Sequence, residues 1–349
     1  MLRRRGRATQ ADIVRSTGLS RSTVSSLLGE LDARGLLTEQ VDHGAPARGR
    51  RPALIGLNRF AGLGIGIDIG ARHLAVAIGD MSRAVHAERW WSGADGAIGV
   101  PSLVDRVEQA MRDANADPDL ILGAGVSIAT PVSPSRSAQA PCLIGAASGQ
   151  LARELAGALG VPVTVENDAV CGLLSELTWG GTGRTETIAY LKWSSRVGCG
   201  LAIDGRVFRG ATGVAGEIGH LTVDRVGPLC WCGGRGCLEL YCGGDRMVRR
   251  LADAGVPVAD LDDVMALVEL DDATATGVVA DAVSMLALGL SQLVELVNPA
   301  RIVVGGQLSR LGERILEPLR ALDSRRCRGQ GGVDDVLRGR RLDPALPAG

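Results

Sequence analysis

The first part of the chain alternates apolar and polar positions with the period of an α-helix. The segment TQADIVRSTGLSRSTVSSLLGELDARGLLTE predicts two short helices separated by a turn at Gly18. Thr9 and Ser20 are the predicted N-caps, and Asp12 follows the first cap by three residues. The packed face of the second helix is predicted at positions i, i+3, i+4 and i+7, which are Val24, Leu27, Leu28 and Leu31. This pattern predicts a helix-turn-helix.

Further along the chain, apolar runs punctuated by glycine replace the helical pattern. The predicted elements are two strands in 62–83, a helix in 101–114, a strand in 120–132, a helix in 150–160, a strand and a helix in 161–180, a hairpin in 187–210, and a helix, a strand and a helix in 282–320. Two halves each open on a glycine-rich strand and turn. The pattern therefore predicts an α/β body of two lobes with a cleft between them.

The charge distribution separates the two parts of the chain. The 349 residues carry a net charge of −1, but residues 1–60 hold eleven arginines against five acidic residues, a net of +6 that leaves about −7 for the rest. A basic head on an acidic body favours nucleic-acid binding, although a solvated basic tail would give the same count. Neither a secretory leader nor a run of about 18 apolar residues is evident, so we expect a cytoplasmic protein without membrane contact.

The polar face of the predicted helix-turn-helix carries groups suited to DNA. Short side chains and one guanidinium can reach base edges and phosphates from a helix in the major groove, and here they are Ser20, Arg21, Ser22, Thr23, Ser25 and Ser26. The following GLLTEQ and ARGRRPALIGLN segments predict a hairpin wing, with Arg48, Arg50 and Arg51 reaching phosphate or the minor groove. A helical hairpin from another kind of domain would share the apolar stripe. We predict a DNA-binding domain over residues 1–58.

One segment, GEIGHLTVDRVGPLCWCGGRGCLEL, concentrates metal ligands. Its His-x9-Cys-x-Cys-x4-Cys pattern offers one imidazole and three thiolates, a closed set for structural zinc, from His220, Cys230, Cys232 and Cys237. A Cys-x-Cys pair is too close for an easy disulfide, and a cytoplasmic chain with eight cysteines favours metal or chance burial over a disulfide framework. Unrelated buried cysteines are the alternative. Glu217 and Glu239 flank the set, where rigid carboxylates can grip sugar hydroxyls.

Four motifs occur in a fixed order: DIGARHLAVAIGD, ENDA, GEIGH followed by CWCGGRGCLE, and IVVGGQLS. In that order they resemble the ROK family of repressors, open reading frames and sugar kinases. The resemblance implies a two-lobed actin-like ATPase (ribonuclease H-like) α/β domain, here over residues 59–322, behind an N-terminal winged helix-turn-helix. It leaves residues 323–349 as an atypical tail, rich in Arg and Gly, which we expect to be disordered.

The resemblance also implies roles for individual residues. It implies the same four zinc ligands. In the family's kinases, the residue matching Asp168 takes a proton from the sugar hydroxyl, and the residues matching Asn167, Glu217 and Glu239 hold the sugar ring. With His220, these residues form the predicted sugar set, and all of them are present. Taken alone, the Asn-Asp pair would indicate only a turn or a helix cap.

The nucleotide side departs from the kinase pattern. In the first loop Asp68 and Gly70 are retained, but Ala71, Arg72 and His73 replace Gly-Thr-Lys. The second loop, SSRVGCG, keeps Gly198 and Gly200 but places Ser194 and Arg196 where kinases have glycine, and an arginine there would obstruct the approach of phosphate to backbone N–H groups. The third loop keeps Gly305 and Gly306, which could equally form a simple strand-to-helix turn.

The sequence therefore predicts a sugar-responsive transcriptional regulator, most simply a repressor, with a degenerate ATP site and no enzymatic activity. Its expected partners are an operator with an inverted repeat, a sugar or sugar-phosphate effector, and a second copy of the chain in a homodimer or a dimer of dimers. Two alternatives stay open. One is an active ATP-dependent kinase of a hexose or an N-acetylhexosamine, and the other is a degraded paralogue that does not bind ligand.

Overall fold

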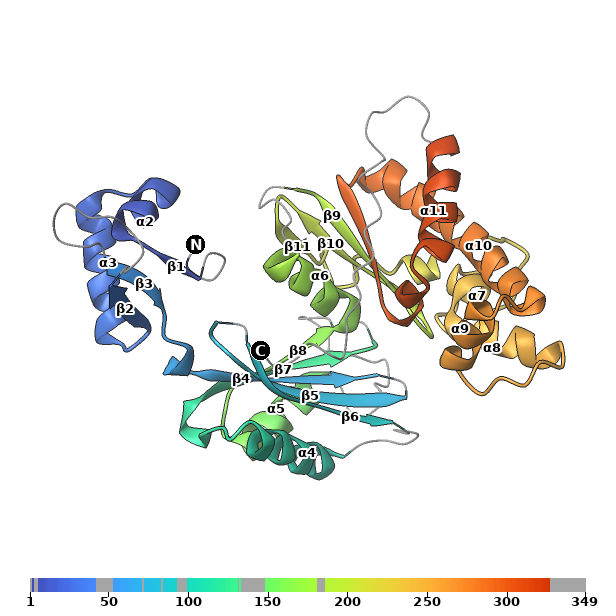
Figure 1. Cartoon of the computed structure of the whole chain (residues 1–349). Helices are drawn as coiled ribbons and strands as arrows, with labels where there is room; N and C mark the ends of the chain where they lie inside the picture. Colours follow the sequence, from blue (N-terminus) through green and yellow to red (C-terminus); the bar gives the residue numbers. More distant parts are fainter. Residues whose placement is uncertain are drawn as a thin grey trace. The chain divides into compact units, whose positions relative to one another are not determined.

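The computed structural model describes residues 2, 6–41, 53–70, 72–82, 84–92, 99–130, 132, 148–180 and 186–326. Two compact units divide the chain: one runs from the N-terminus to Ile128 and includes residues 148–166, and the other includes Asn167 onward. Figure 1 shows the N-terminal head, the first lobe and the second lobe as separate bodies, each described here by itself.

The head begins with the predicted helix-turn-helix. Helix α2 (Gln10–Thr17) is capped by Thr9, whose hydroxyl accepts from the Asp12 N–H while the Asp12 carboxylate accepts from the Thr9 N–H. Helix α3 (Arg21–Ala33) is capped by Ser20, which accepts from the Thr23 N–H at 3.1 Å. Gly18 ends α2 with φ of 70°. The predicted caps and turn are confirmed.

A three-stranded sheet completes the head, in the order β1-β3-β2. Strands β1 (Arg7–Ala8) and β2 (Leu37–Val41) both pair antiparallel with β3 (Ala53–Leu57). The β2–β3 pairing is the hairpin that the sequence predicts, and it closes a small core of Ala8, Ile13, Val24, Leu37 and Ile55. The predicted wing residues Arg48, Arg50 and Arg51 lie outside the described residues.

The predicted packed face of α3 is only half right. Val24 is 1% exposed and Leu28 packs against the same core, but Leu27 and Leu31 are 45% and 37% exposed. The core of the head is small and contacts only a narrow strip of α3. Val24 and Leu28, an i, i+4 pair, occupy that strip. Leu27 and Leu31 fall on the neighbouring strip and stay at the surface.

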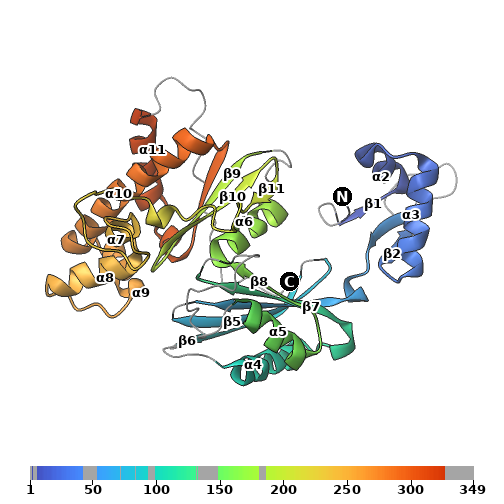
Figure 2. The same cartoon turned by 180° about the vertical axis from the view of Figure 1, so that it is seen from behind.

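The first lobe is a five-stranded sheet with helices on one face (Figures 1 and 2). Its order is β6-β5-β4-β7-β8. Strands β4 (Leu63–Ile69), β5 (His73–Asp80) and β6 (Val85–Ser92) form an antiparallel meander, and β7 (Ile121–Ile128) pairs parallel with β4. The short helix η1 (Arg59–Ala61) precedes β4. The remaining elements are α4 (Val100–Asp113), η2 (Pro118–Leu120), α5 (Ser148–Leu159) and β8 (Val163–Asn167).

The second lobe repeats this plan. Strands β9 (Ile188–Trp193), β10 (Val197–Ile203) and β11 (Arg206–Phe208) form an antiparallel meander, and β12 (Arg301–Gly305) pairs parallel with β9. Helix α6 (Asp168–Trp179) packs on one face, around a core of Leu173, Ile188, Tyr190, Ala202 and Val303. The larger core lies on the other face and includes Leu191 and Trp193.

The crossover between β11 and β12 holds the cysteine-rich segment and most of the helices. They are η3 (Ile218–His220), α7 (Glu239–Cys242), α8 (Gly244–Asp253), α9 (Leu261–Glu269) and α10 (Ala273–Val297). By length and composition α10 could cross a membrane, but 56% of its most apolar window is buried, as in a core helix of a folded domain. Two elements follow β12, η4 (Gln307–Leu311) and α11 (Glu313–Arg326).

Helix α11 corrects one predicted boundary. The sequence predicts an irregular tail from residue 323, whereas the helix continues to Arg326. Pro318 lies inside it, and the helix continues past this residue. The rest of the predicted tail, residues 327–349, lies outside the described residues.

Asp80 is the charged residue most completely enclosed in the first lobe. Its side chain is 1% exposed, and its carboxylate accepts hydrogen bonds from the Ser82 N–H at 2.7 Å and from Arg59 Nε at 3.3 Å and lies 2.9 Å from His86 Nε2. Burial alone would raise the pKa of Asp80, but hydrogen bonds from Ser82, His86 and the Ala84 backbone outweigh it and lower the pKa below 3.8. Asp80 thus fixes the β5–β6 turn and the Arg59 segment that precedes β4.

Asp80→Asn is expected to cost about 1–3 kcal/mol of unfolding free energy at pH 7, since charge-assisted hydrogen bonds to a buried carboxylate are lost. The carboxylate is more acidic in the folded state than in the unfolded state. Its contribution is therefore complete above the unfolded pKa and falls as the pH drops through the lower folded value. Urea unfolding at pH 7, 5, 4 and 3 measures this. Exposed Asp204, whose φ of 52° suits Asn, supplies the control Asp204→Asn. If the difference in unfolding free energy between the wild type and Asp80→Asn stayed the same down to pH 3, the stabilising role of the Asp80 carboxylate would be contradicted.

Candidate functional site

The four predicted metal ligands come together in the second lobe. The ligand atoms of His220, Cys230, Cys232 and Cys237 all lie within 4.8 Å of one another. His220 ends η3, and Cys237 precedes α7, whereas the other two cysteines lie in the intervening turns. An antiparallel bridge between Thr222 and Cys237 holds the two ends of the segment together.

The distances within this set fit a tetrahedral ion. Ligands at about 2.3 Å (sulfur) and 2.0 Å (nitrogen) from zinc lie roughly 3.5–3.8 Å from one another. Here Cys230 Sγ is 3.6 Å from His220 Nδ1, and Cys232 Sγ is 3.6 Å from Cys237 Sγ. The second distance is also far too long for a disulfide. One imidazole and three thiolates form a closed structural set, with no position for a catalytic water.

His220 presents its two ring nitrogens to two different groups. Nδ1 faces Cys230, and Nε2 lies 4.0 Å from the Glu217 carboxylate. Burial lowers the pKa of His220 more than the charge of Glu239 raises it, so the ring is neutral at pH 7, as a metal ligand must be. One imidazole can therefore join the metal set to the sugar set.

Glu217 is held by tight backbone packing. Gly216 before it has φ of 93°, and a Cβ there would lie 2.0 Å from the Cys199 carbonyl oxygen, so only glycine fits. Burial, together with the charges of Asp168 and Glu239, raises the pKa of Glu217 to about 7. The three predicted sugar-side acids are therefore close enough to influence one another.

Glu239, the first residue of α7, is fixed at both oxygens. Oε1 accepts from Trp231 Nε1 at 3.1 Å, and Oε2 accepts from the Val197 N–H at 3.4 Å. Trp231 lies between two of the cysteines and makes an edge contact with His220, with ring centroids 4.8 Å apart. The acid is therefore joined both to the metal segment and to the start of β10.

Asn167 and Asp168 begin helix α6. The Asn167 side chain caps the helix by accepting from the Ala169 and Val170 N–H groups, and its amide donates to the Thr130 carbonyl at 3.2 Å. Asp168 is the first helical residue, with its side chain 11% exposed and paired with Lys192. The whole predicted sugar set, Asn167, Asp168, Glu217, His220 and Glu239, thus belongs to the second lobe.

In the first predicted nucleotide loop, His73 covers Gly70. His73 Nε2 lies 2.8 Å from Asp68 Oδ2, and the His73 ring is tilted against that of Trp90, with ring centroids 5.3 Å apart. A Cβ on Gly70 would lie 2.1 Å from that ring. The imidazole therefore covers the glycine that a kinase would present to phosphate. Ala71 lies outside the described residues.

The second loop is also closed by its own side chains. Ser194 Oγ accepts from the Gln307 N–H at 2.9 Å, and the Arg196 guanidinium lies 5.4 Å from the centre of the Trp231 ring. Gly198 and Gly200 face helix α6. A Cβ on Gly200 would lie 2.7 Å from the Ala169 carbonyl oxygen, so this glycine allows close packing of the helix.

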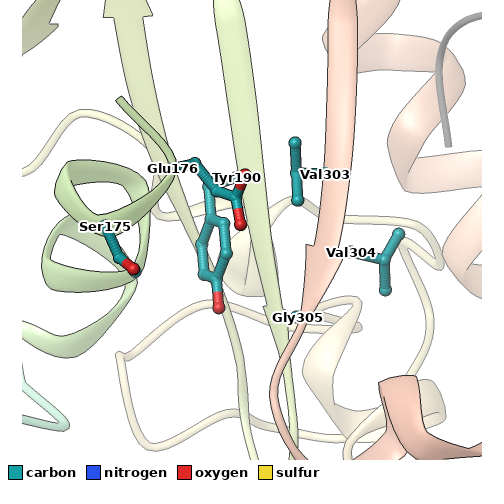
Figure 3. Close-up of a pocket in the computed structure, with 7 residues that line it drawn as sticks. Ser175, Glu176, Tyr190, Val303, Val304 and Gly305 are labelled. Carbon is teal, nitrogen blue, oxygen red and sulfur yellow. The ribbon is translucent and has the colours of Figure 1, made fainter. Parts of the chain in front are cut away.

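Packing also accounts for the third glycine pair. Gly306 has φ of 85°, and a Cβ there would lie 2.6 Å from the Trp193 carbonyl oxygen. Gly305 lies against the Tyr190 ring, which Figure 3 shows between helix α6 and strand β12. The cavity around Tyr190 measures about 30 Å³, enough for water but far below the several hundred Å³ of a ligand pocket.

The predicted recognition helix presents its polar face to solvent. The exposed residues are Ser20, Arg21, Ser22, Thr23, Ser25 and Ser26. The Ser20 hydroxyl bonds the hydroxyls of Ser22 and Thr23 at 2.8 Å as part of the cap, whereas Arg21, Ser25 and Ser26 lie along the helix beyond it. An exposed N-terminus and short hydroxyls suit phosphate and base contacts.

The ROK family sequence model matches residues 64–342, and a MarR family model matches residues 1–49. The chain belongs to the ROK family. A putative xylose repressor of Caldicellulosiruptor sp. is 29% identical over 338 residues, covering 91% of this chain and 84% of that protein. A glucokinase of Streptomyces coelicolor is 28% identical over 284 residues, covering 74% of this chain and 86% of its own length.

A solved structure extends the likeness to the whole architecture. A ROK family transcriptional regulator, a homologue of the E. coli MLC protein, has a TM-score of 0.73 and 21% identity, covering 95% of this chain and 87% of its own. This ROK protein therefore combines a MarR-type winged helix-turn-helix with the two-lobed actin-like domain. The predicted family and fold class are confirmed.

Two side chains of this ROK protein were missed by the sequence reasoning. Lys192 contacts Asp168 of the predicted sugar set, and Trp231 orients Glu239. Trp231 falls between two predicted metal ligands and could have been noted there. Lys192 had a stronger signal, because it is the only lysine in the sequence.

Cys232→Ser is expected to lower bound zinc from about one ion per chain to well below that, and to destabilise the second lobe, because a structural ion contributes folding free energy. Metal analysis of freshly purified protein and thermal unfolding measure both effects. Cys171, on α6 outside the ligand set, supplies the control Cys171→Ser, which should keep its metal. Absence of zinc from the wild type, or equal zinc in both variants, would contradict the site.

Proposed function

We propose that this ROK protein is a sugar-responsive DNA-binding transcriptional regulator, acting as a repressor. One observation carries the proposal. The sugar-side residues Asn167, Asp168, Glu217, His220 and Glu239 are all present and held by specific contacts, while the loops that would receive a nucleotide are filled by the protein's own side chains. Such a domain is suited to binding a sugar without phosphorylating it.

The head supplies the DNA-binding half of this function. The exposed hydroxyls and Arg21 of α3 would lie in the major groove, and the β2–β3 hairpin, with Arg48, Arg50 and Arg51, would contact the backbone beside it. We propose a homodimer, or a dimer of dimers, on an inverted repeat, since two recognition helices on a two-fold axis read two half-sites. The protein would act in the cytoplasm, where its operator is.

The metal set supports the sugar site in this proposal. A structural zinc on His220 and the three cysteines would immobilise the segment that carries Glu217, Trp231 and Glu239. It would take no part in chemistry, because all four positions are occupied by protein ligands.

Xylose is the first effector to test, because the Caldicellulosiruptor relative is named a putative xylose repressor. Glucose is the second, because the Streptomyces relative is named a glucokinase.

The alternative function, an ATP-dependent sugar kinase, is favoured by the likeness to the Streptomyces glucokinase. Against it stand His73 over Gly70, the Ser194–Gln307 bond and Arg196. We expect a coupled ATP assay with glucose, xylose, N-acetylglucosamine, N-acetylmannosamine and allose to give no turnover above background, with the Streptomyces glucokinase as positive control. A rate of about 1 per second or more with any of these sugars would establish the kinase instead.

A sugar effector is expected to weaken operator binding by roughly 5- to 150-fold, the usual range of coupling between two sites. Linkage requires that the same sugar bind the operator complex more weakly by the same factor. Asp168→Ala should abolish the sugar response, since it removes a hydroxyl acceptor. Operator titrations with and without xylose or glucose, each normalised to the sugar-free affinity of the same variant, measure this.

The control for that titration is Asp204→Asn, at an exposed acid of the same lobe that lies outside the predicted set and has a φ that suits Asn. It should respond to sugar as the wild type does. If no sugar and no sugar phosphate shifts the wild-type titration, the sensing function is wrong. If Asp168→Ala responds normally, the sensing function stands but the assigned sugar site is wrong.

A further inference from the structure

The chain contains a single lysine. Of 38 basic Lys and Arg residues, 37 are arginine, and the exception is Lys192 on β9. Arginine presents a wide planar fork of donors, whereas lysine presents a compact ammonium with three donors at one point. A chain that uses arginine everywhere else has therefore placed its one ammonium group beside Asp168, in the predicted sugar site.

The contact between the two side chains is direct and sheltered. Lys192 Nζ donates to Asp168 Oδ2, and the two side chains are 23% and 11% exposed. Residues two apart on a strand share a face, so Lys192 follows Ile188 and Tyr190 on the face that packs against α6. The lysine stem thereby runs along the sheet to the N-terminal end of the helix, where Asp168 begins it.

The neighbouring strands add no side chain beside Lys192 in its row of the sheet. In the register of the sheet, Lys192 lies directly opposite Gly198 on β10 and Gly305 on β12. Residues opposite each other in a sheet project on the same side, so this row reads glycine, lysine, glycine and has one side chain. A Cβ on Gly198 would already approach Ala169 Cβ at 3.3 Å. The Tyr190 ring fills the corresponding place beside Gly305, so both glycines allow close packing next to Lys192.

The charges around the pair favour a neutral ligand. Three acids belong to the sugar side, Asp168, Glu217 and Glu239; Asp168 is paired with Lys192, and Glu239 accepts from Trp231 and from the Val197 N–H. The nearby cations are Lys192, already paired, and Arg196, whose guanidinium lies over Trp231. A phosphate or carboxylate entering this set would meet more negative than unpaired positive charge.

Building on the proposed function, we propose that Lys192 is a positioning and specificity residue of the effector site. Its ammonium holds Asp168 in one orientation, with Oδ2 occupied and Oδ1 assigned to a hydroxyl of the effector, which is a neutral aldose and not a sugar phosphate. A carboxylate paired with an ammonium through one oxygen can still accept a hydrogen bond from a hydroxyl through the other. Lys192 would thereby convert the position of a kinase base into a fixed binding group.

The single lysine makes the test selective. Reductive methylation of the full-length, zinc-loaded protein with ¹³C-formaldehyde keeps the positive charge and labels only Lys192 and the N-terminal amine. In the Lys192→Arg variant only the N-terminal amine is labelled, so this variant identifies which signal belongs to Lys192. In the absence of sugar, Asp168→Asn should shift the Lys192 methyl resonance, and Asp204→Asn should not. Saturating D-xylose or D-glucose should shift it in the wild type, whereas xylose 5-phosphate and glucose 6-phosphate should not.

Operator release gives the second readout. Lys192→Met should raise the concentration of D-xylose or D-glucose needed for half-release by about tenfold or more, the usual effect of losing a charge-assisted hydrogen bond. Lys192→Arg should recover part of that loss, because it restores the charge with a less suited shape. A merely structural role of the lysine stem would be satisfied by Met and would give no such recovery.

The outcomes separate this inference from the function on which it rests. A wild type that releases its operator with sugar, together with an unresponsive Lys192 signal or an unchanged Lys192→Met variant, overturns the inference and leaves the function intact. Release by sugar phosphates alone overturns the neutral-aldose assignment. A wild type that responds to none of these compounds removes the proposed function itself. If Lys192→Met does not fold, the resonance shifts in the native sequence decide.

Discussion

Helix α6 lies closer to its sheet than ordinary side chains would allow, and the candidate site depends on this approach. A Cβ on Gly200 would collide with the Ala169 carbonyl oxygen, and one on Gly198 would touch the Ala169 side chain. With glycine at both positions, the N-terminus of α6 comes down onto β9 and β10. Asp168 then reaches Lys192 on β9. Val197, the first residue of β10, donates its N–H to Glu239 and fixes that side chain. Close packing against α6 is thus sufficient to account for glycine at positions 198 and 200.

The fold was largely predictable because its signals are local. Thr9 and Ser20 cap helices that they immediately precede, Gly18 ends the first of them, and glycine-punctuated apolar runs mark β4, β5, β9 and β10. The metal ligands also fall within one short segment. Two predictions failed where a local pattern cannot report tertiary contacts: the head core is too small to cover Leu27 and Leu31, and α11 extends past the expected boundary.

The interior of the site was less predictable, because its decisive contacts join residues far apart in the sequence. Lys192 and Asp168 are 24 positions apart, and Ser194 and Gln307 are 113 apart. The sequence shows that Arg196 and His73 replace kinase residues, but only the structure shows where they go: one lies over Trp231 and the other over Gly70. Substitution in a motif indicates that a function has changed, whereas the new contacts indicate what replaced it.

The repeated plan of the two lobes has a consequence for synthesis on the ribosome. In the second lobe, β9 ends at Trp193, and its parallel partner β12 begins only at Arg301, 108 residues later. At translation rates of about 5–20 residues per second, that edge of β9 waits roughly 5–20 s for its partner. During this interval an apolar strand has an unpaired edge, and the growing chain is open to pairing with other chains. The cysteine-rich segment and helices α8, α9 and α10 are made within the same interval, before the sheet of the second lobe is complete.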